Sequence, residues 1–221
     1  MNIVVSCILN FIPLVLIFIL VKIFNKDFSV FWGFLALLLG LLAVVPIALM
    51  QFLLSKAGFI RQETLVSMLL YDLILNGLVE ECFKMLVLFI LPAKKLNFKD
   101  FFICSVLCGL TLASFENLIY LIAGTEHFGL RIFTSMIIHC CCAALSGVFV
   151  YSCKIKKVYF SPFIASFLIH GIYNYFAGYA MNTVFFYFSF LMIVFGLVEC
   201  RIKFKNFDEK FGENLLVKKS D

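Results

Sequence analysis

Charged residues are scarce in this chain of 221 residues: they make up 14% of it, whereas hydrophobic residues make up 64%. Soluble domains are about 25% charged and about 45–50% apolar, so this composition excludes an ordinary soluble domain. The mean hydropathy of +1.09 instead predicts an integral membrane protein. Nucleic-acid binding would need a basic soluble surface. None is evident, so we predict membrane lipids, and no nucleic acid, as partners.

Several other features are absent. The nine cysteines form no Cys-x-x-Cys pair, so no disulfide framework is implied. Their one cluster, at residues 140–142, is predicted to be apolar packing, with metal ligation by one of them as the alternative. No His-Glu-x-x-His motif supports zinc independently. There is also no linker, repeat or low-complexity tract, which predicts one transmembrane bundle over residues 1–200 and a short cytosolic tail at 201–221.

Long apolar stretches are abundant. About 20 residues are needed to cross the hydrocarbon core of a bilayer, and seven stretches qualify. We therefore predict an all-α, polytopic transmembrane bundle of about seven spans. The first stretch lacks a basic n-region and is too long for a typical secretory signal, so we expect it to be retained. The expected spans are residues 3–24, 30–54, 64–91, 99–123, 129–152, 158–179 and 182–200.

The basic residues predict the orientation of these spans. With seven spans, most of the 18 Lys and Arg residues fall on the side that holds the C-terminus. Lys56, Arg61 and Arg131 fall on the other side, and Lys84 lies within a span. Because cytoplasmic loops carry an excess of Lys and Arg, we predict an outside N-terminus and an inside C-terminus.

The third to sixth stretches each place small or polar residues three or four apart, on one face of a helix. Polar groups in lipid need partners inside the bundle, so these four faces are expected to meet. The remaining stretches are expected to be outer packing. The faces carry Asp72, Asn76, Glu80 and Lys84; then Ser105, Gly109, Ala113, Glu116, Asn117 and Tyr120; then Ser135, His139, Cys142 and Ser146; then Ser166, His170, Asn174 and Gly178.

Glu80 and Glu81 are the most unusual pair, because a charge at the bilayer centre costs at least about 2.5–3.5 kcal/mol. Glu80 and Lys84 are spaced for an ion pair along the helix. Glu81 points about 100° away, so Lys84 does not easily satisfy both carboxylates. Two adjacent carboxylates in a low-dielectric site do not both ionise readily. One of them is therefore a candidate general base.

The other intramembrane polar residues complete a candidate catalytic set. His139 and His170 lie mid-span, and Asn174 is one turn from His170, where it could orient the ring. Glu116 and Tyr120 share a face, with Asn117 beside them. Asp72 and Asn76 are expected in a polar vestibule or in packing.

Such a set suits hydrolysis of a peptide bond by water that a glutamate activates, with a histidine or Asn174 stabilising the oxyanion. A zinc site of His139, His170 and Glu116, with Glu80 or Glu81 as base, is the alternative chemistry. The residues alone favour no cofactor.

The order of motifs resembles the PrsW family of intramembrane proteases, within the wider group that contains the CAAX prenyl endopeptidases. Residues 80–84 fit Glu-Glu-x-x-Lys, residues 115–120 fit Phe-Glu-x-x-x-Tyr, His139 follows in the next span, and residues 170–174 fit His-x-x-x-Asn/Asp. The similarity covers about residues 65–178, which would be the catalytic core. The CAAX-type relatives use Glu-Glu-x-x-x-Arg and Phe-x-x-x-His. Here the basic residue, Lys84, comes only three residues after Glu81, and Ile119 stands four after Phe115, which disfavours prenyl-protein processing.

The resemblance implies a bacterial protease of the cytoplasmic membrane that acts on a single-span protein. Known members make the first cut in an anti-sigma factor during a stress response. It also implies catalytic roles for Glu80, Glu81, Glu116, His139, His170 and Asn174, with Lys84, Tyr120 and Asn117 supporting. By similarity to the metal-free relatives, Glu80 is the base and Glu81 supports it, although the two roles could be exchanged.

Two other functions compete with proteolysis at this point. Mid-membrane Glu, Lys and His also form proton relays in transporters. However, the chain shows no inverted repeat and no paired broken helices of the kind that transporters use. A non-catalytic relative that acts as a scaffold or immunity factor is the second alternative, and the intact motifs argue against it.

Overall fold

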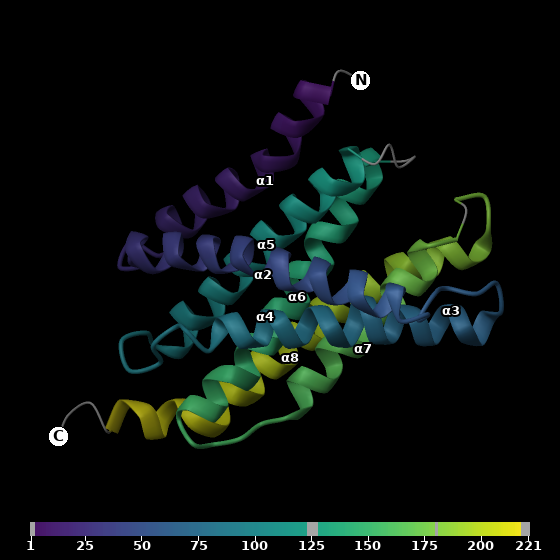
Figure 1. The fold of residues 1–221 in the computed structure, drawn as a ribbon. Coiled ribbons are helices and arrows are strands. Elements are labelled where there is room, and N and C mark those ends of the chain that lie inside the picture. Colours follow the sequence, from purple (N-terminus) through teal and green to yellow (C-terminus); the bar gives the residue numbers. More distant parts are fainter. Residues whose placement is uncertain (1–2, 123–127, 180, 218–221) are drawn as a thin grey trace.

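The computed structural model describes residues 3–122, 128–179 and 181–217, and this part of the chain contains helices and no strand (Figure 1). The predicted all-α class is confirmed. The helices are α1 (Ile3–Phe24), α2 (Val30–Lys56), α3 (Leu65–Tyr71), η1 (Asp72–Val79), α4 (Glu80–Leu88), α5 (Phe98–Ile122), α6 (Phe128–Lys154), α7 (Ser161–Ala177) and α8 (Val184–Val217).

Five of the seven expected spans are single helices that are long and apolar enough to cross a membrane: α1, α2, α5, α6 and α8. The expected third span is helical from Leu65 to Leu88 but is divided into α3, η1 and α4. The expected sixth span, α7, has 17 residues, starts with Pro162 in its first turn and ends at Ala177. Whether these two segments also cross the membrane stays a prediction, as does the orientation of the bundle.

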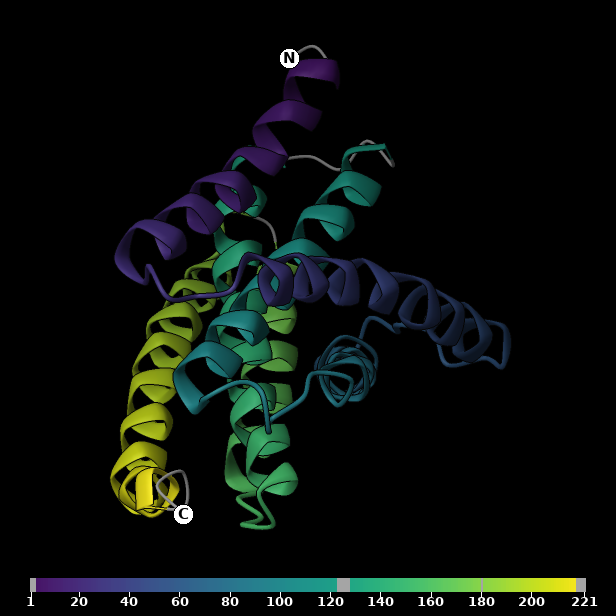
Figure 2. The same cartoon turned by 90° about the vertical axis from the view of Figure 1, so that its left-hand side faces the viewer.

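Helices α5 and α6 form the centre of the bundle, and α7 and α8 pack against α6 (Figures 1 and 2). In the apolar stretch of α6, 78% is buried within the protein, whereas in that of α1 only 6% is buried. Figure 2 shows α1 above α8 at the edge of the bundle, where α1 packs on α5. Apolar side chains that face lipid lose nothing by remaining outside the protein, so α1 is outer packing, as predicted.

The last helix does not end where the sequence analysis placed the start of the tail. Helix α8 continues for 34 residues from Val184 to Val217, without a break near residue 200. The boundary between residues 200 and 201 is therefore a change of composition within one helix, from apolar to mixed charge. Residues 218–221 of the expected tail lie outside the described residues.

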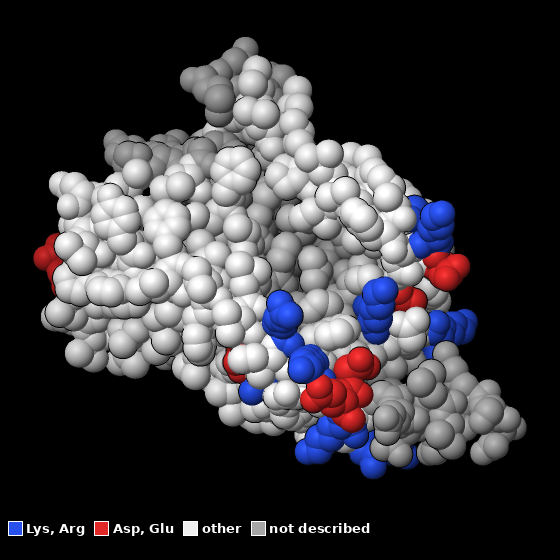
Figure 3. Space-filling model, turned by 180° about the vertical axis from the view of Figure 1, so that it is seen from behind, with Lys and Arg blue, Asp and Glu red and all other residues white. Residues whose placement is uncertain are grey.

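Charged side chains gather at one end of the molecule. Figure 3 shows the face that carries α1 and α8: most of it is uncharged, most of its Lys, Arg, Asp and Glu collect at the lower right, and an acidic group lies at the left edge. This arrangement fits a protein whose apolar middle faces lipid and whose charged end faces water.

The helix that carries the glutamate pair is irregular just before it. η1 is a π-helix of eight residues, Asp72–Val79, and α4 begins at Glu80. π-Helical turns within α-helices are rare and occur frequently at functional sites. η1 packs closely on α7 through two glycines: a Cβ atom at Gly171 would lie 2.7 Å from the Cα of Leu73, and one at Gly77 would lie 2.5 Å from the carbonyl oxygen of Phe167.

Candidate active site

Glu81 is the centre of a buried polar cluster drawn from three helices. Its side chain is fully buried in α4. Its Oε2 atom lies 2.7 Å from Ser166 Oγ of α7 and 3.1 Å from Ser146 Oγ of α6, and its Oε1 atom lies 2.8 Å from His170 Nδ1 of α7. Both carboxylate oxygens thus have several partners, and Glu81 ties α4 to α6 and α7.

Lys84 forms its ion pair with Glu81, three residues before it, and both side chains are fully buried. The helical spacing also allowed an ion pair of Lys84 with Glu80, but the ion pair among the described residues joins Lys84 to Glu81. The spacing of three residues also brings side chains together on a helix, and the two serines and His170 hold Glu81 on the same side of α4 as Lys84. The ammonium group also lies 3.4 Å from His139 Nδ1.

Glu80 has a different environment from its neighbour. Its Oε1 atom accepts a hydrogen bond of 3.1 Å from Gln51 Nε2, which reaches in from α2. Its Oε2 atom is buried, has no hydrogen-bond partner among the described residues, and lies 3.8 Å from His170 Nε2. The prediction that α2 is only outer packing is wrong, because Gln51 and its neighbours form part of the site.

The two histidines lie side by side in the same cluster. Their ring centroids are 4.7 Å apart, in an edge-on arrangement. His139 Nε2 lies 2.7 Å from Glu116 Oε2 on α5. Because the Lys84 ammonium can only donate, His139 Nδ1 accepts, and the proton of the neutral ring is then on Nε2, the nitrogen that faces Glu116. His170 donates through Nδ1–H to Glu81, which leaves its Nε2 atom facing Glu80.

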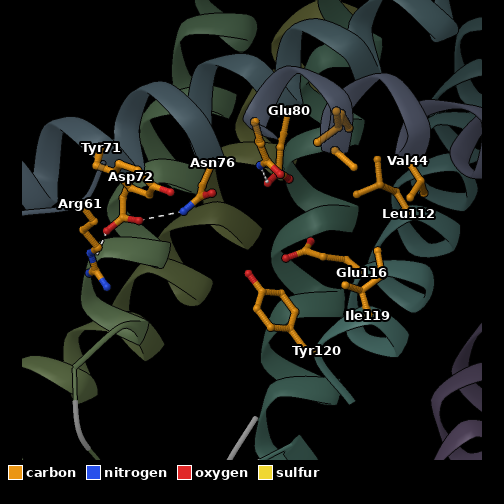
Figure 4. A pocket seen from close by; sticks show the side chains of 13 residues that line it. Val44, Arg61, Tyr71, Asp72, Asn76, Glu80, Leu112, Glu116, Ile119 and Tyr120 are labelled. Atoms are coloured by element: carbon orange, nitrogen blue, oxygen red, sulfur yellow. Dashed lines mark hydrogen bonds and ion pairs between the residues drawn. The ribbon is translucent and has the colours of Figure 1, made fainter. Parts of the chain in front are cut away.

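A pocket of about 380 Å³ opens beside Glu80 (Figure 4). Glu80 lies across the pocket from Glu116 and Tyr120. At its other end Asp72 accepts hydrogen bonds from Arg61 (3.0 Å) and Asn76 (2.7 Å). Apolar side chains complete the wall, among them Val44, Ile47, Leu112 and Ile119. The polar vestibule expected at Asp72 and Asn76 is present, and Arg61, taken from the sequence only as a topology signal, is part of it.

Some expected partners do not contact the cluster. Asn174 is half-buried, and among the described residues no hydrogen bond joins it to His170, whose ring is held by Glu81. Asn117 is fully buried, but neither its amide nitrogen nor its oxygen has a hydrogen-bond partner in the described part of the chain. Tyr120 does line the pocket beside Glu116, as the shared helix face predicted.

Two sets of side chains bring metal-ligating atoms within 4.8 Å of one another: Glu80, His139 and His170; and Glu81, Cys142 and His170. The expected zinc set of His139, His170 and Glu116 is not among these groups within the described residues; Glu80 takes the place of Glu116. The first set fits a divalent ion, because it supplies two imidazoles and a carboxylate whose Oε2 atom is buried without a hydrogen-bond partner. Glu81 in the second set is already paired with Lys84.

Fold and site together define a multi-pass membrane protein with carboxylates and histidines buried between its helices and a pocket beside them. The model of one protein family, described as PrsW family intramembrane metalloprotease, matches residues 29–198. The chain belongs to this family, which confirms the resemblance seen in the motifs, and the family's activity is proteolysis within membranes. Searches of curated proteins and of solved structures found no match.

Proposed function

We propose that this protein is an intramembrane endopeptidase in which Glu80 activates the water that hydrolyses a peptide bond. The observation that carries this assignment is the contrast between the two adjacent glutamates. Glu81 is engaged by Lys84, His170 and two serine hydroxyls. Glu80, which lines the pocket, keeps one buried oxygen without a hydrogen-bond partner among the described residues. A general base needs such an available oxygen within reach of water.

In the proposed reaction, Glu80 Oε2 takes a proton from water while the water oxygen attacks the carbonyl carbon of the substrate. The tetrahedral intermediate then collapses, the carbon–nitrogen bond breaks, and the proton passes from Glu80 to the leaving amine. Stabilisation of the charge that develops on the carbonyl oxygen requires His170 to carry a proton on Nε2 in addition to the Nδ1 proton that Glu81 accepts. Glu81 positions His170 through the 2.8 Å contact to Nδ1, and Lys84 compensates the charge of Glu81.

The substrate that we propose is a single-span membrane protein, because only a membrane-anchored chain would meet a pocket between transmembrane helices. By similarity to the family, an anti-sigma factor that is cut first at this site during a stress response is the specific candidate. The proposed location is the cytoplasmic membrane of a bacterium.

The test is to reconstitute the protein in vesicles with single-span candidate substrates and to identify cleavage fragments by mass spectrometry. We expect two complementary fragments from the wild type and from Glu63→Gln, whose carboxylate is exposed in the loop before α3. The double variant Glu80→Gln/Glu81→Gln should give none. Fragments from the double variant would contradict the proposal, and ion flux without fragments would favour a transporter.

A metal-assisted reaction is the second candidate, favoured by the Glu80–His139–His170 set and by the description of the family. A divalent ion there would polarise the substrate carbonyl or the attacking water. Against it, His139 already contacts Lys84 and Glu116 through its two nitrogens, so a ligand role would break one of these contacts. We therefore prefer the metal-free reaction. Stoichiometric zinc in active protein, lost together with activity on chelation, would reverse this preference.

A further inference from the structure

Two adjoining cavities on the face that carries α1 and α8 differ sharply in character. The first, which we call the basic groove, has a volume of about 560 Å³ and lies between the start of α5 and the middle of α8. Lys99, Arg201 and Lys205 line it, together with Phe102, Ile103 and Phe204. It therefore has cations at its rim and aromatic and aliphatic carbons between them.

The second, which we call the apolar cavity, has a volume of about 680 Å³. Side chains of α1, α5 and α6 form most of its wall, and Leu197 of α8 completes it. Val106 of this cavity is one helical turn from Phe102 of the basic groove, and Leu197 is one turn from Arg201. The two cavities thus follow each other along α5 and α8. Figure 3 shows a recess on this face, with Lys and Arg along its lower side.

The cations of the basic groove are not neutralised by the acids around them. Within the described residues, Lys99 and Arg201 have no ion-pair partner. Asp100, next to Lys99, accepts hydrogen bonds from Asn25 and Asn97 instead. Lys205 lies 3.4 Å from Glu209, but both side chains are largely exposed, and such pairs contribute little. The groove therefore keeps a net positive charge.

We propose that these two cavities together form a binding site for one anionic phospholipid. Its headgroup phosphate would lie among Lys99, Arg201 and Lys205, and its acyl chains would extend along α5 and α8 into the apolar cavity. Basic pockets between transmembrane helices at the basic end of a membrane protein bind anionic headgroups. The charge of the groove and the apolar cavity that follows it along α5 and α8 match a lipid better than a soluble anion, which would leave the cavity unfilled. Bound there, the lipid would fill the space between α1 and the rest of the bundle.

The test is native mass spectrometry of the full chain in detergent, after addition of phosphatidylglycerol, phosphatidylcholine or inorganic phosphate. We expect one phosphatidylglycerol to be retained at least about tenfold more tightly than phosphatidylcholine, and inorganic phosphate not to compete. In Lys99→Gln/Arg201→Gln/Lys205→Gln this preference should be lost. Equal retention of both lipids by the wild type, or displacement by inorganic phosphate, would overturn the proposal.

The matched control, Lys94→Gln/Lys95→Gln/Lys157→Gln, removes the same charge from exposed positions at the same end of the molecule. It should retain phosphatidylglycerol as the wild type does. If both triple variants lost retention equally, binding would depend on the net charge of the protein and not on the basic groove, which would refute the site. A second variant, Val106→Trp, fills the apolar cavity and keeps the cations. It should weaken retention, whereas Leu41→Trp, on the exposed side of α2, should not. Unchanged retention in Val106→Trp would exclude the acyl-chain half of the proposal.

Discussion

At the scale of single residues, the two adjacent glutamates differ in their environments, and these environments suit different roles. Helical geometry turns them about 100° apart, so one faces the pocket and the other faces α6 and α7. Glu81 gains an ammonium, an imidazole and two hydroxyls as partners. Such a carboxylate serves structure and positioning. Glu80, with one hydrogen bond from Gln51, keeps an oxygen without a partner among the described residues, and we propose that this oxygen takes the proton from water.

This division predicts different effects on stability. Glu81→Gln leaves the Lys84 ammonium buried without its counter-charge, and removing one partner of a buried pair costs about 3–5 kcal/mol. We expect a free energy of unfolding lower by about that amount, measured by denaturant titration in detergent. Lys84→Met should cost as much, and the double variant Glu81→Gln/Lys84→Met should recover part of the loss.

The control for this experiment is Glu209→Gln, which removes the exposed pair with Lys205 and should cost less than about 1 kcal/mol. If Glu81→Gln were as harmless as Glu209→Gln, the buried pair would not hold the helices together as described.

Which site residues the sequence could reveal depended on how unusual they are in lipid. Placing an ionisable side chain in the middle of a membrane span costs free energy, so such residues indicate a site. The sequence analysis could therefore identify Glu80, Glu81, Glu116, His139 and His170 as candidates. Ser146, Ser166 and Gln51 were missed as partners because serine is common at helix–helix contacts and Gln51 lies near the end of an apolar helix. The sequence also could not predict which glutamate pairs with Lys84, because side chains of α6 and α7 position Glu81 for this ion pair.

At the scale of elements, the π-helix and its packing on α7 determine where the glutamates point. η1 ends directly before Glu80, so its turns set the rotation of α4 about its axis. Gly77 and Gly171 allow the backbones of η1 and α7 to approach closely, which brings His170 to Glu81. Periodicity in the sequence predicts a helix over these residues but does not distinguish a π-helical turn within it.

Gly171→Ala should therefore lower the proteolytic activity, although residue 171 is not itself one of the proposed catalytic residues. The added Cβ would meet the Cα of Leu73 at 2.7 Å, so α7 must move away from η1. We expect proteolysis to fall by at least about tenfold, since displacement of catalytic groups by an ångström can cost about a hundredfold. Cleavage of a reconstituted substrate measures the effect. The matched control is Gly196→Ala on α8, where the nearest atoms lie at ordinary contact distance, 3.5 Å. Equal activity of the two variants would contradict this role of the close approach.

At the scale of the whole molecule, composition was enough to predict the class of fold and hydropathy enough to locate the helices. The length of α8 was not predictable in this way, because a change from apolar to charged residues marks a membrane boundary and not the end of a helix. The crossing count is likewise open for α7 and for the divided helix over residues 65–88. Their polar faces are buried in the bundle, which allows shorter and less regular helices.

The orientation predicts where fused reporters are active. Five or seven crossings both place the termini on opposite sides, and the excess of Lys and Arg places the C-terminus inside. A reporter that is active only in the cytosol should therefore work when fused after Asp221 and fail when fused before Met1. The reverse pattern would contradict the orientation, and activity at both ends would require an even number of crossings.

The central claim, that Glu80 activates the water, is tested most directly by the cleavage rate of Glu80→Gln at saturating substrate. The amide oxygen of glutamine can still accept the hydrogen bond from Gln51, but an amide cannot take up a proton from water as a carboxylate does. We predict a free energy of unfolding within about 1 kcal/mol of the wild type and a cleavage rate lower by about 10²–10⁴-fold. A folded Glu80→Gln variant that cleaves within tenfold of the wild-type rate would contradict the account.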